Sequence, residues 1–203
     1  MKKNSFFAET NRLEAFSDGV FAIIITIMVL ELRAPHAPTL AALVPLVPIF
    51  LSYLLSFVYV AIYWNNHHHL LHATNGVTGG IMWANMHLLF WLSLIPFVTE
   101  WLGQNRMEAA PSVLYGVILL CAALAYFILV RLIILHQGKD SKLAQAIGND
   151  RKGFVSIALY LIAIGGSFVN TWIATACFTI VAFLWIVPDR RIARMHAHET
   201  DHE

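Results

Sequence analysis

The densest group of potential metal ligands in this sequence is a run of four histidines: His67, His68, His69 and His72. Residues four positions apart share one face of a helix, and paired imidazoles at that spacing are typical of zinc sites. No acidic residue or cysteine stands near this run in the sequence, and the metalloprotease pattern HExxH is absent. We therefore predict that the protein holds no resident metal and that these histidines mark a helix end.

A second polar feature is the pair Ser17 and Asp18, which lies inside the apolar stretch FSDGVFAIIITIMVLEL. An ionisable side chain in a membrane helix is costly in lipid and normally faces protein, water or a partner group. We therefore expect Ser17 and Asp18 to turn inward and to fasten this helix to its own subunit. The expected partners are His67, bonded to Ser17 or Asp18, and Asn85 in the segment MWANMHLLF.

The same stretch carries an aliphatic stripe that includes one hydroxyl group: Ile23, Thr26, Ile27 and Leu30. Because an ideal helix turns by about 100° per residue, this stripe lies on the face opposite Ser17 and Asp18. The residues alone leave two interpretations open. Either the stripe meets lipid, or it lines an axis around which several copies of the chain assemble.

The composition indicates which kind of fold holds these residues. Of the 203 residues, 59% are hydrophobic and 12% are charged, whereas soluble domains carry about 25% charged residues. No Asp, Glu, Lys or Arg occurs between Arg33 and Glu100. These features predict an all-α integral membrane protein. The sequence also lacks a nucleotide-binding glycine loop, a nucleophile elbow and paired carboxylates, so we expect no enzyme activity, no cofactor and no nucleic acid partner.

We expect six membrane spans within a single domain of residues 1–203, of which the last two are short. The stretch from Gly153 to Pro188 is too long for one span, and its polar break SFVNT suggests two short helices. The expected spans are about 13–32, 43–64, 80–102, 112–132, 154–169 and 172–187.

The orientation of these spans follows from their basic residues, since cytoplasmic loops are rich in lysine and arginine. With six spans, only Arg33 and Arg106 fall on one side of the membrane. The other basic residues share the side of both termini: Lys2, Lys3, Arg12, Arg131, Lys139, Lys142, Arg151, Lys152, Arg190, Arg191 and Arg194. We therefore predict a multi-pass protein of the cell (inner) membrane with cytoplasmic termini.

Three segments of the sequence resemble those of a known family. The first segment is Arg12 followed by the FSDGVFAI run, and the second is Trp64 with the histidines that follow it. The third contains Trp83 and Asn85 with the SLIPF run. They are similar to the prokaryotic relatives of transmembrane protein 175, the endolysosomal potassium channel. The resemblance covers roughly residues 12–102, and the later spans agree with the family in hydropathy and length.

This resemblance implies a homotetramer with six transmembrane helices per subunit, in which the first helix lines a central pore. The family's aliphatic constriction falls on Ile23, Ile27 and Leu30, and its pore threonine falls on Thr26. The resemblance also implies structural roles for the residues that tie the first helix to its neighbours: Arg12, Phe16, Ser17 and Asp18.

The predicted function is a moderately selective potassium channel, through which monovalent cations pass down their electrochemical gradient. No carbonyl filter of the TVGYG type occurs, so selectivity would depend on the cost of ion dehydration and on Thr26 hydroxyls. Two alternatives remain. A secondary transporter commonly shows inverted repeats, which are not visible here, and a non-conducting membrane scaffold would have no need for a threonine within the stripe.

Overall fold

The structure is a computed structural model that describes residues 2–138, 140–148 and 150–186. The described residues form helices joined by short loops, without a strand among them. The elements in chain order are α1 (Lys2–Leu30), η1 (Leu40–Leu46), α2 (Val47–His72), α3 (Gly79–Ser93), α4 (Ile95–Gln104), α5 (Ala109–Gln137), α6 (Lys142–Ile147), α7 (Arg151–Gly166) and α8 (Thr171–Ile186). The predicted all-α class is therefore confirmed.

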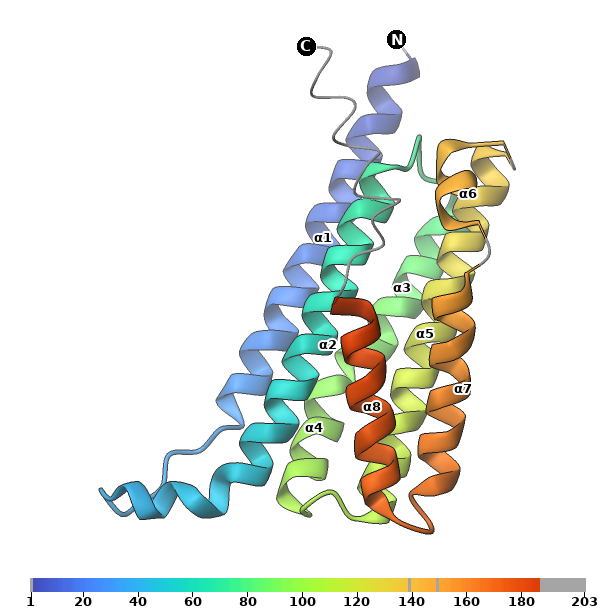
Figure 1. Cartoon of the computed structure of the whole chain (residues 1–203). Helices are drawn as coiled ribbons and strands as arrows, with labels where there is room; N and C mark the ends of the chain where they lie inside the picture. Colours follow the sequence, from blue (N-terminus) through green and yellow to red (C-terminus); the bar gives the residue numbers. More distant parts are fainter. Residues whose placement is uncertain (1, 139, 149, 187–203) are drawn as a thin grey trace.

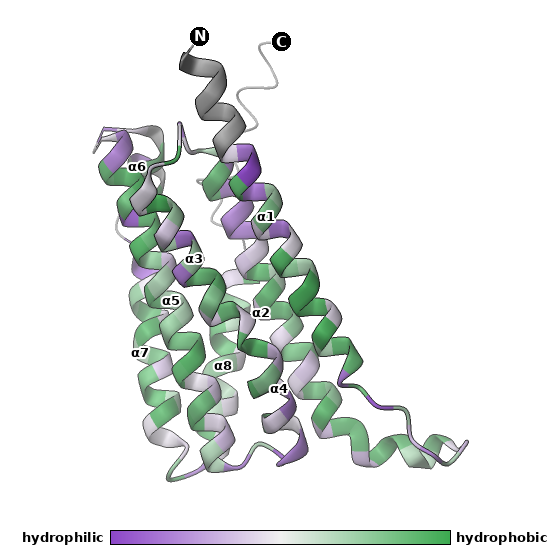
Figure 2. Ribbon diagram, turned by 180° about the vertical axis from the view of Figure 1, so that it is seen from behind, coloured by the Kyte–Doolittle hydropathy of each residue, from purple (hydrophilic) through white to green (hydrophobic). Residues whose placement is uncertain are grey.

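Among the described residues, four helical segments are long and apolar enough to cross a membrane. They are Thr10–Leu30, Leu40–His72, Gly79–Gln104 and Ala109–Gln137. Helices α7 and α8 have 16 residues each, and the polar break between them forms the turn that joins them. Apolar residues cover most of the bundle's length, whereas hydrophilic residues gather near its two ends (Figure 2). The chain is thus a membrane protein with several spanning helices.

Helix α1 lies at the side of the bundle and is covered by other helices on one side only. It contacts α2, α3 and α4, whereas α5, α7 and α8 form the opposite side of the bundle (Figure 1). The short helix η1 extends away from the bundle at the end where α1 finishes (Figure 1). This arrangement leaves a long face of α1 without a helical neighbour within the described chain.

The third spanning segment is bent where α3 gives way to α4. Pro96 lies in the first turn of α4 and has no backbone N–H, so one intrahelical hydrogen bond is missing and its ring crowds the preceding turn. Leu94 nevertheless keeps right-handed helical backbone angles, with φ of −87° and ψ of −10°. The proline therefore bends one span and does not end it.

The two ends of the bundle carry different loops. Helix α1 begins at the same end as α6, and η1 lies at the opposite end (Figure 1). Part of the predicted orientation depends on Lys139, Arg190, Arg191 and Arg194, which lie outside the described residues, as does the C-terminal end of the chain.

Buried hydroxyl groups connect the helices of the bundle. Ser56 and Tyr115 form a hydrogen bond of 2.9 Å between α2 and α5, and the Thr99 hydroxyl of α4 donates to Ser56 at 2.6 Å. The Tyr59 hydroxyl donates to the Phe178 carbonyl at 2.7 Å and so joins α2 to α8. Polar side chains bond to one another here because the apolar interior offers no water.

Gly103 marks a close approach of α4 to α2 that a larger residue would disturb. A methyl group at this position would lie 2.5 Å from Ser52 Oγ and 2.7 Å from the Ile49 Cα atom. We expect Gly103→Ala to destabilise the protein by about 1–3 kcal/mol, which thermal unfolding in detergent would report as a lower midpoint. Gly165→Ala is the matched control, because that exposed helical position has open space around it. Equal midpoints for the two variants would contradict the predicted contact.

Candidate functional site

Helix α1 has two distinct faces. The buried face repeats at intervals of three or four residues and consists of Leu13, Ser17, Phe21, Ile24 and Met28. Phe21, Ile24 and Met28 are each 2% exposed and belong to the apolar core shared with α2 and α3. Such spacing follows the period of a helix with one side against protein. The rotation of α1 about its own axis is therefore fixed by its packing within the subunit.

The opposite face of α1 presents the predicted stripe. Ile23 is 58% exposed, Ile27 is 42% exposed and Leu30 is 72% exposed. Thr26 is also exposed, and its hydroxyl donates a hydrogen bond of 2.8 Å to the Ala22 carbonyl one turn earlier. The structure thus places all four residues on one uncovered side of the subunit. Their role in a pore stays a prediction.

A chain of buried hydrogen bonds holds the inward face of α1. Asn85 on α3 is fully buried; its Nδ2 donates to Ser17 Oγ at 2.9 Å, and its Oδ1 lies 2.7 Å from His67 Nε2. The Ser17 hydroxyl in turn donates to the Leu13 carbonyl at 2.8 Å. Because an amide oxygen only accepts, this arrangement assigns the proton of His67 to Nε2. The chain links α1, α3 and α2 inside the bundle.

The partners of His67 and Asp18 differ from those expected. His67 reaches Ser17 only through Asn85, so the expected direct bond from His67 to Ser17 or Asp18 was wrong. Asp18 is half-buried at the edge between α1 and α2, where its Oδ1 accepts a hydrogen bond of 2.9 Å from the Trp64 indole. Asp18 therefore pairs with an indole N–H at the edge of the bundle, whereas the buried His67 pairs with Asn85.

Arg12 and Phe16 lie on the exposed side of α1. Arg12 is exposed, Phe16 is 56% exposed, and both precede Ile23 at helical intervals of three or four residues along one line. The exposed stripe therefore continues from Leu30 back to Arg12. This extension follows from the same helical period, although the sequence reasoning had grouped Arg12 and Phe16 with the fastening residues Ser17 and Asp18.

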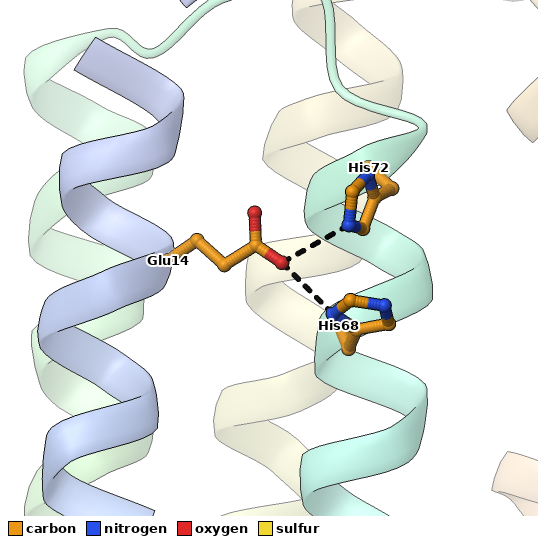
Figure 3. Close-up of side chains that lie close together, drawn as sticks. All are labelled: Glu14, His68 and His72. Carbon is orange, nitrogen blue, oxygen red and sulfur yellow. Dashed lines mark ion pairs between the residues drawn. The ribbon is translucent and has the colours of Figure 1, made fainter. Parts of the chain in front are cut away.

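The histidines of α2 have an acidic neighbour that the sequence reasoning missed. Glu14 projects from α1 toward His68 and His72 (Figure 3), and its Oε1 lies 2.8 Å from His68 Nδ1 and 3.3 Å from His72 Nε2. The histidines have no acidic neighbour along the sequence, but in the structure Glu14 completes a group of three potential metal ligands with His68 and His72. Glu14 is distant in the chain and arrives only because α1 lies against α2.

Comparison with known proteins identifies the family of this chain. Residues 12–96 match the family model described as endosomal/lysosomal potassium channel TMEM175. A protein of Chryseobacterium sp. (strain P1-3) that is named a potassium channel is 51% identical over 183 residues, which cover 90% of this chain and 95% of that relative. The chain belongs to the TMEM175 family. This family consists of ion channels and is not a class of enzymes.

More distant TMEM175 relatives agree with this assignment. A potassium channel of Chamaesiphon minutus is 32% identical over 195 residues, covering 87% of this chain and 93% of the relative. The crystal structure of a lysosomal potassium-selective channel TMEM175 homolog from the same organism superposes with a TM-score of 0.77, at 28% identity over 90% of this chain and 98% of that chain. The endosomal/lysosomal proton channel TMEM175 of Rattus norvegicus is 27% identical, and the match covers 84% of this chain but only 38% of the rat protein.

The matched family region contains the whole arrangement described above. The exposed stripe of α1, the hydrogen-bond chain through Asn85 and the Glu14 group all lie within residues 12–96. The region that matches the family model therefore contains both α1, with its uncovered face, and the residues that hold this helix in the bundle.

Proposed function

We propose that this protein is a potassium-preferring cation channel in which four copies of α1 surround a central pore. The observation that carries the proposal is the uncovered stripe on α1, a helix whose opposite face is fastened by a buried hydrogen-bond chain. A fixed rotation of α1 keeps the stripe directed at one place, as a pore-lining helix requires. The names of the bacterial relatives as potassium channels support the same function.

The proposed assembly is a homotetramer with cyclic symmetry, because repeating one subunit around an axis turns a single stripe into a closed ring. Each subunit contributes six membrane helices, with α7 and α8 as short spans beside α5. In this proposal, both termini lie on the cytoplasmic side of the inner membrane. The exposed positions of Arg12 and Phe16 support contacts of these residues with neighbouring subunits or with the cytoplasmic mouth.

The constriction of this pore is formed by rings of Ile23, Ile27 and Leu30. Leu30 follows Ile23 by seven positions, which gives a hydrophobic length of about 10 Å. Narrow apolar pores of this kind exclude water and so block ions, and they conduct when the ring widens and becomes wet. The constriction is therefore the gate, and ions cross it down their electrochemical gradient without a cofactor.

Thr26 supplies the oxygen ligands that favour potassium. Its hydroxyl hydrogen is engaged with the Ala22 carbonyl, so the oxygen lone pairs are left to face away from the helix. Four such oxygens would replace part of the hydration shell of a passing ion. Potassium sheds water more easily than sodium does, and a single ring of hydroxyls gives only a moderate preference.

The test of this function is ion flux through the purified protein in proteoliposomes, driven by a potassium gradient with sodium as the comparison. Electrodiffusive flux of both ions, faster for potassium, supports the channel. Saturable exchange coupled to a second ion would instead support a secondary transporter, and absence of flux in a folded protein would support a non-conducting scaffold. Crosslinking of the same sample measures whether four chains assemble.

Replacing the threonine tests its part in selectivity. Thr26→Val keeps the shape of the side chain but removes the oxygen, so we expect the ratio of potassium to sodium flux to fall toward one while total flux persists. Thr26→Ser retains the hydroxyl group and should keep most of the preference. An unchanged flux ratio in Thr26→Val would remove this residue from the selectivity mechanism.

A further inference from the structure

The three side chains Glu14, His68 and His72 surround one point at the boundary of α1 and α2. Their ligand atoms all lie within 4.8 Å of one another, and two of the separations are 2.8 Å and 3.3 Å. In a tetrahedral site with metal–ligand bonds of about 2.0–2.1 Å, ligand atoms stand about 3.3 Å apart. Small side-chain rotations therefore suffice to bring these three atoms around a single ion.

The chemistry of the group selects the class of ion. Two imidazole nitrogens and one carboxylate oxygen form the ligand set of three-residue zinc sites, in which water occupies the fourth position. Calcium and magnesium prefer sites built from oxygen alone. The geometry thus favours zinc or a similar transition-metal ion over the alkaline-earth ions.

The surroundings hold the ligands in place and leave a route for the ion. Glu14 has a side chain that is only 14% exposed, whereas His68 and His72 are 36% and 50% exposed. The indole of Trp64 is stacked on the His68 ring, with centroids 5.8 Å apart and planes inclined by 22°. Packing against Trp64 therefore restricts the rotation of His68, and both imidazoles keep a part of their surface uncovered within the subunit.

From this arrangement we propose that Glu14, His68 and His72 form a Zn²⁺ site that clamps α1 to α2. Glu14 is the only ligand from α1, and it precedes Ile23 by nine residues, or about 14 Å along the helix. Metal binding therefore ties the helix that carries the stripe to a helix inside the bundle. The effect of Zn²⁺ on conduction rests on the proposed channel function. The binding of Zn²⁺ is independent of that function.

The first test is direct Zn²⁺ binding to the purified full-length protein in detergent, measured by titration calorimetry. The three tail histidines, His196, His198 and His202, lie outside the described residues and are replaced by alanine in every sample to remove a competing ligand source. We expect one Zn²⁺ per chain, and affinity about tenfold or more weaker in His68→Ala, His72→Ala and Glu14→Gln. His136→Ala, which removes an exposed histidine of α5, should bind as the parent does.

The second test measures the clamp without relying on conduction. Zn²⁺ should raise the unfolding midpoint of the parent and of His136→Ala, and leave that of His72→Ala unchanged. Equal affinity or equal stabilisation across all of these variants would overturn the site.

The third test measures the effect of the site on conduction. In proteoliposomes Zn²⁺ should reduce potassium flux in the parent but not in His72→Ala. Zn²⁺ binding and stabilisation with unchanged flux would overturn the link to the pore. Absence of flux before Zn²⁺ is added counts against the channel function alone.

Discussion

Replacing Ile23 with asparagine is expected to raise potassium flux through proteoliposomes by about tenfold or more. Ile23 is 58% exposed in the subunit, and in the proposed tetramer its four copies form the first apolar ring of the pore. Asparagine has as many side-chain heavy atoms as isoleucine but binds water, so the ring would stay wet when the pore is narrow. A tenfold increase requires the barrier to fall by only about 1.4 kcal/mol.

The control for this prediction is Ile180→Asn. Ile180 is an aliphatic residue of α8 that is 52% exposed, and α8 lies on the side of the bundle away from α1. Both variants place an amide on an apolar surface, but only the first wets the proposed gate. If the two variants leave flux equally unchanged while remaining folded, Ile23 does not form the gate; if both raise flux, the increase reflects damage to the membrane or the fold.

The faces of α1 were predictable from sequence because one helix obeys one period. The positions of Ile23, Thr26 and Leu30 relative to Ser17 depend only on a rotation of about 100° per residue, and burial in the structure agrees with that division. The need of polar groups for partners likewise predicted that Ser17, His67 and Asn85 would gather in the bundle. These conclusions required no knowledge of how far one helix is shifted along another.

The errors arose where such a shift decides which side chains meet. Asn85 stands between Ser17 and His67, and Glu14 reaches His68 and His72, because of the relative height of α1, α2 and α3 in the bundle. A search for metal ligands along the sequence near the histidines could not find Glu14. Hydropathy places helices in the same membrane but gives no axial register between them.

The bend between α3 and α4 shows a related limit. Pro96 was visible in the sequence, and a proline can either end a helix or bend it, so the sequence left both outcomes open. The structure shows that the chain continues, with Leu94 as the single residue between the two helices. Helix α4 packs against α2 and α5, and such contacts between distant segments are not visible in any local pattern of the sequence.

Replacing Asn85 with leucine is expected to cause the largest loss of stability among the fastening residues. The variant would leave the His67 Nε2 hydrogen and the Ser17 oxygen without their shared partner in a position that is fully buried. An unsatisfied buried polar group costs about 1–3 kcal/mol, and two such groups arise at once. Because His67 and Ser17 belong to different helices, the loss should also release the rotation of α1 and make potassium flux more variable between preparations.

Unfolding in mixed micelles of increasing dodecyl sulfate content measures this prediction, with Asn66→Leu as the matched control. Within the described part of the chain, the Asn66 side chain donates to the Ile62 carbonyl of its own helix, so its removal breaks no described link between helices. We expect Asn85→Leu to unfold at a clearly lower detergent fraction than either the parent or this control. The double variant Asn85→Leu with His67→Phe should recover part of the loss, since it also removes the unpaired imidazole hydrogen. If Asn85→Leu unfolds together with the Asn66 control, the buried hydrogen-bond chain does not hold α1, and the orientation of its exposed stripe depends on the apolar packing of Phe21, Ile24 and Met28.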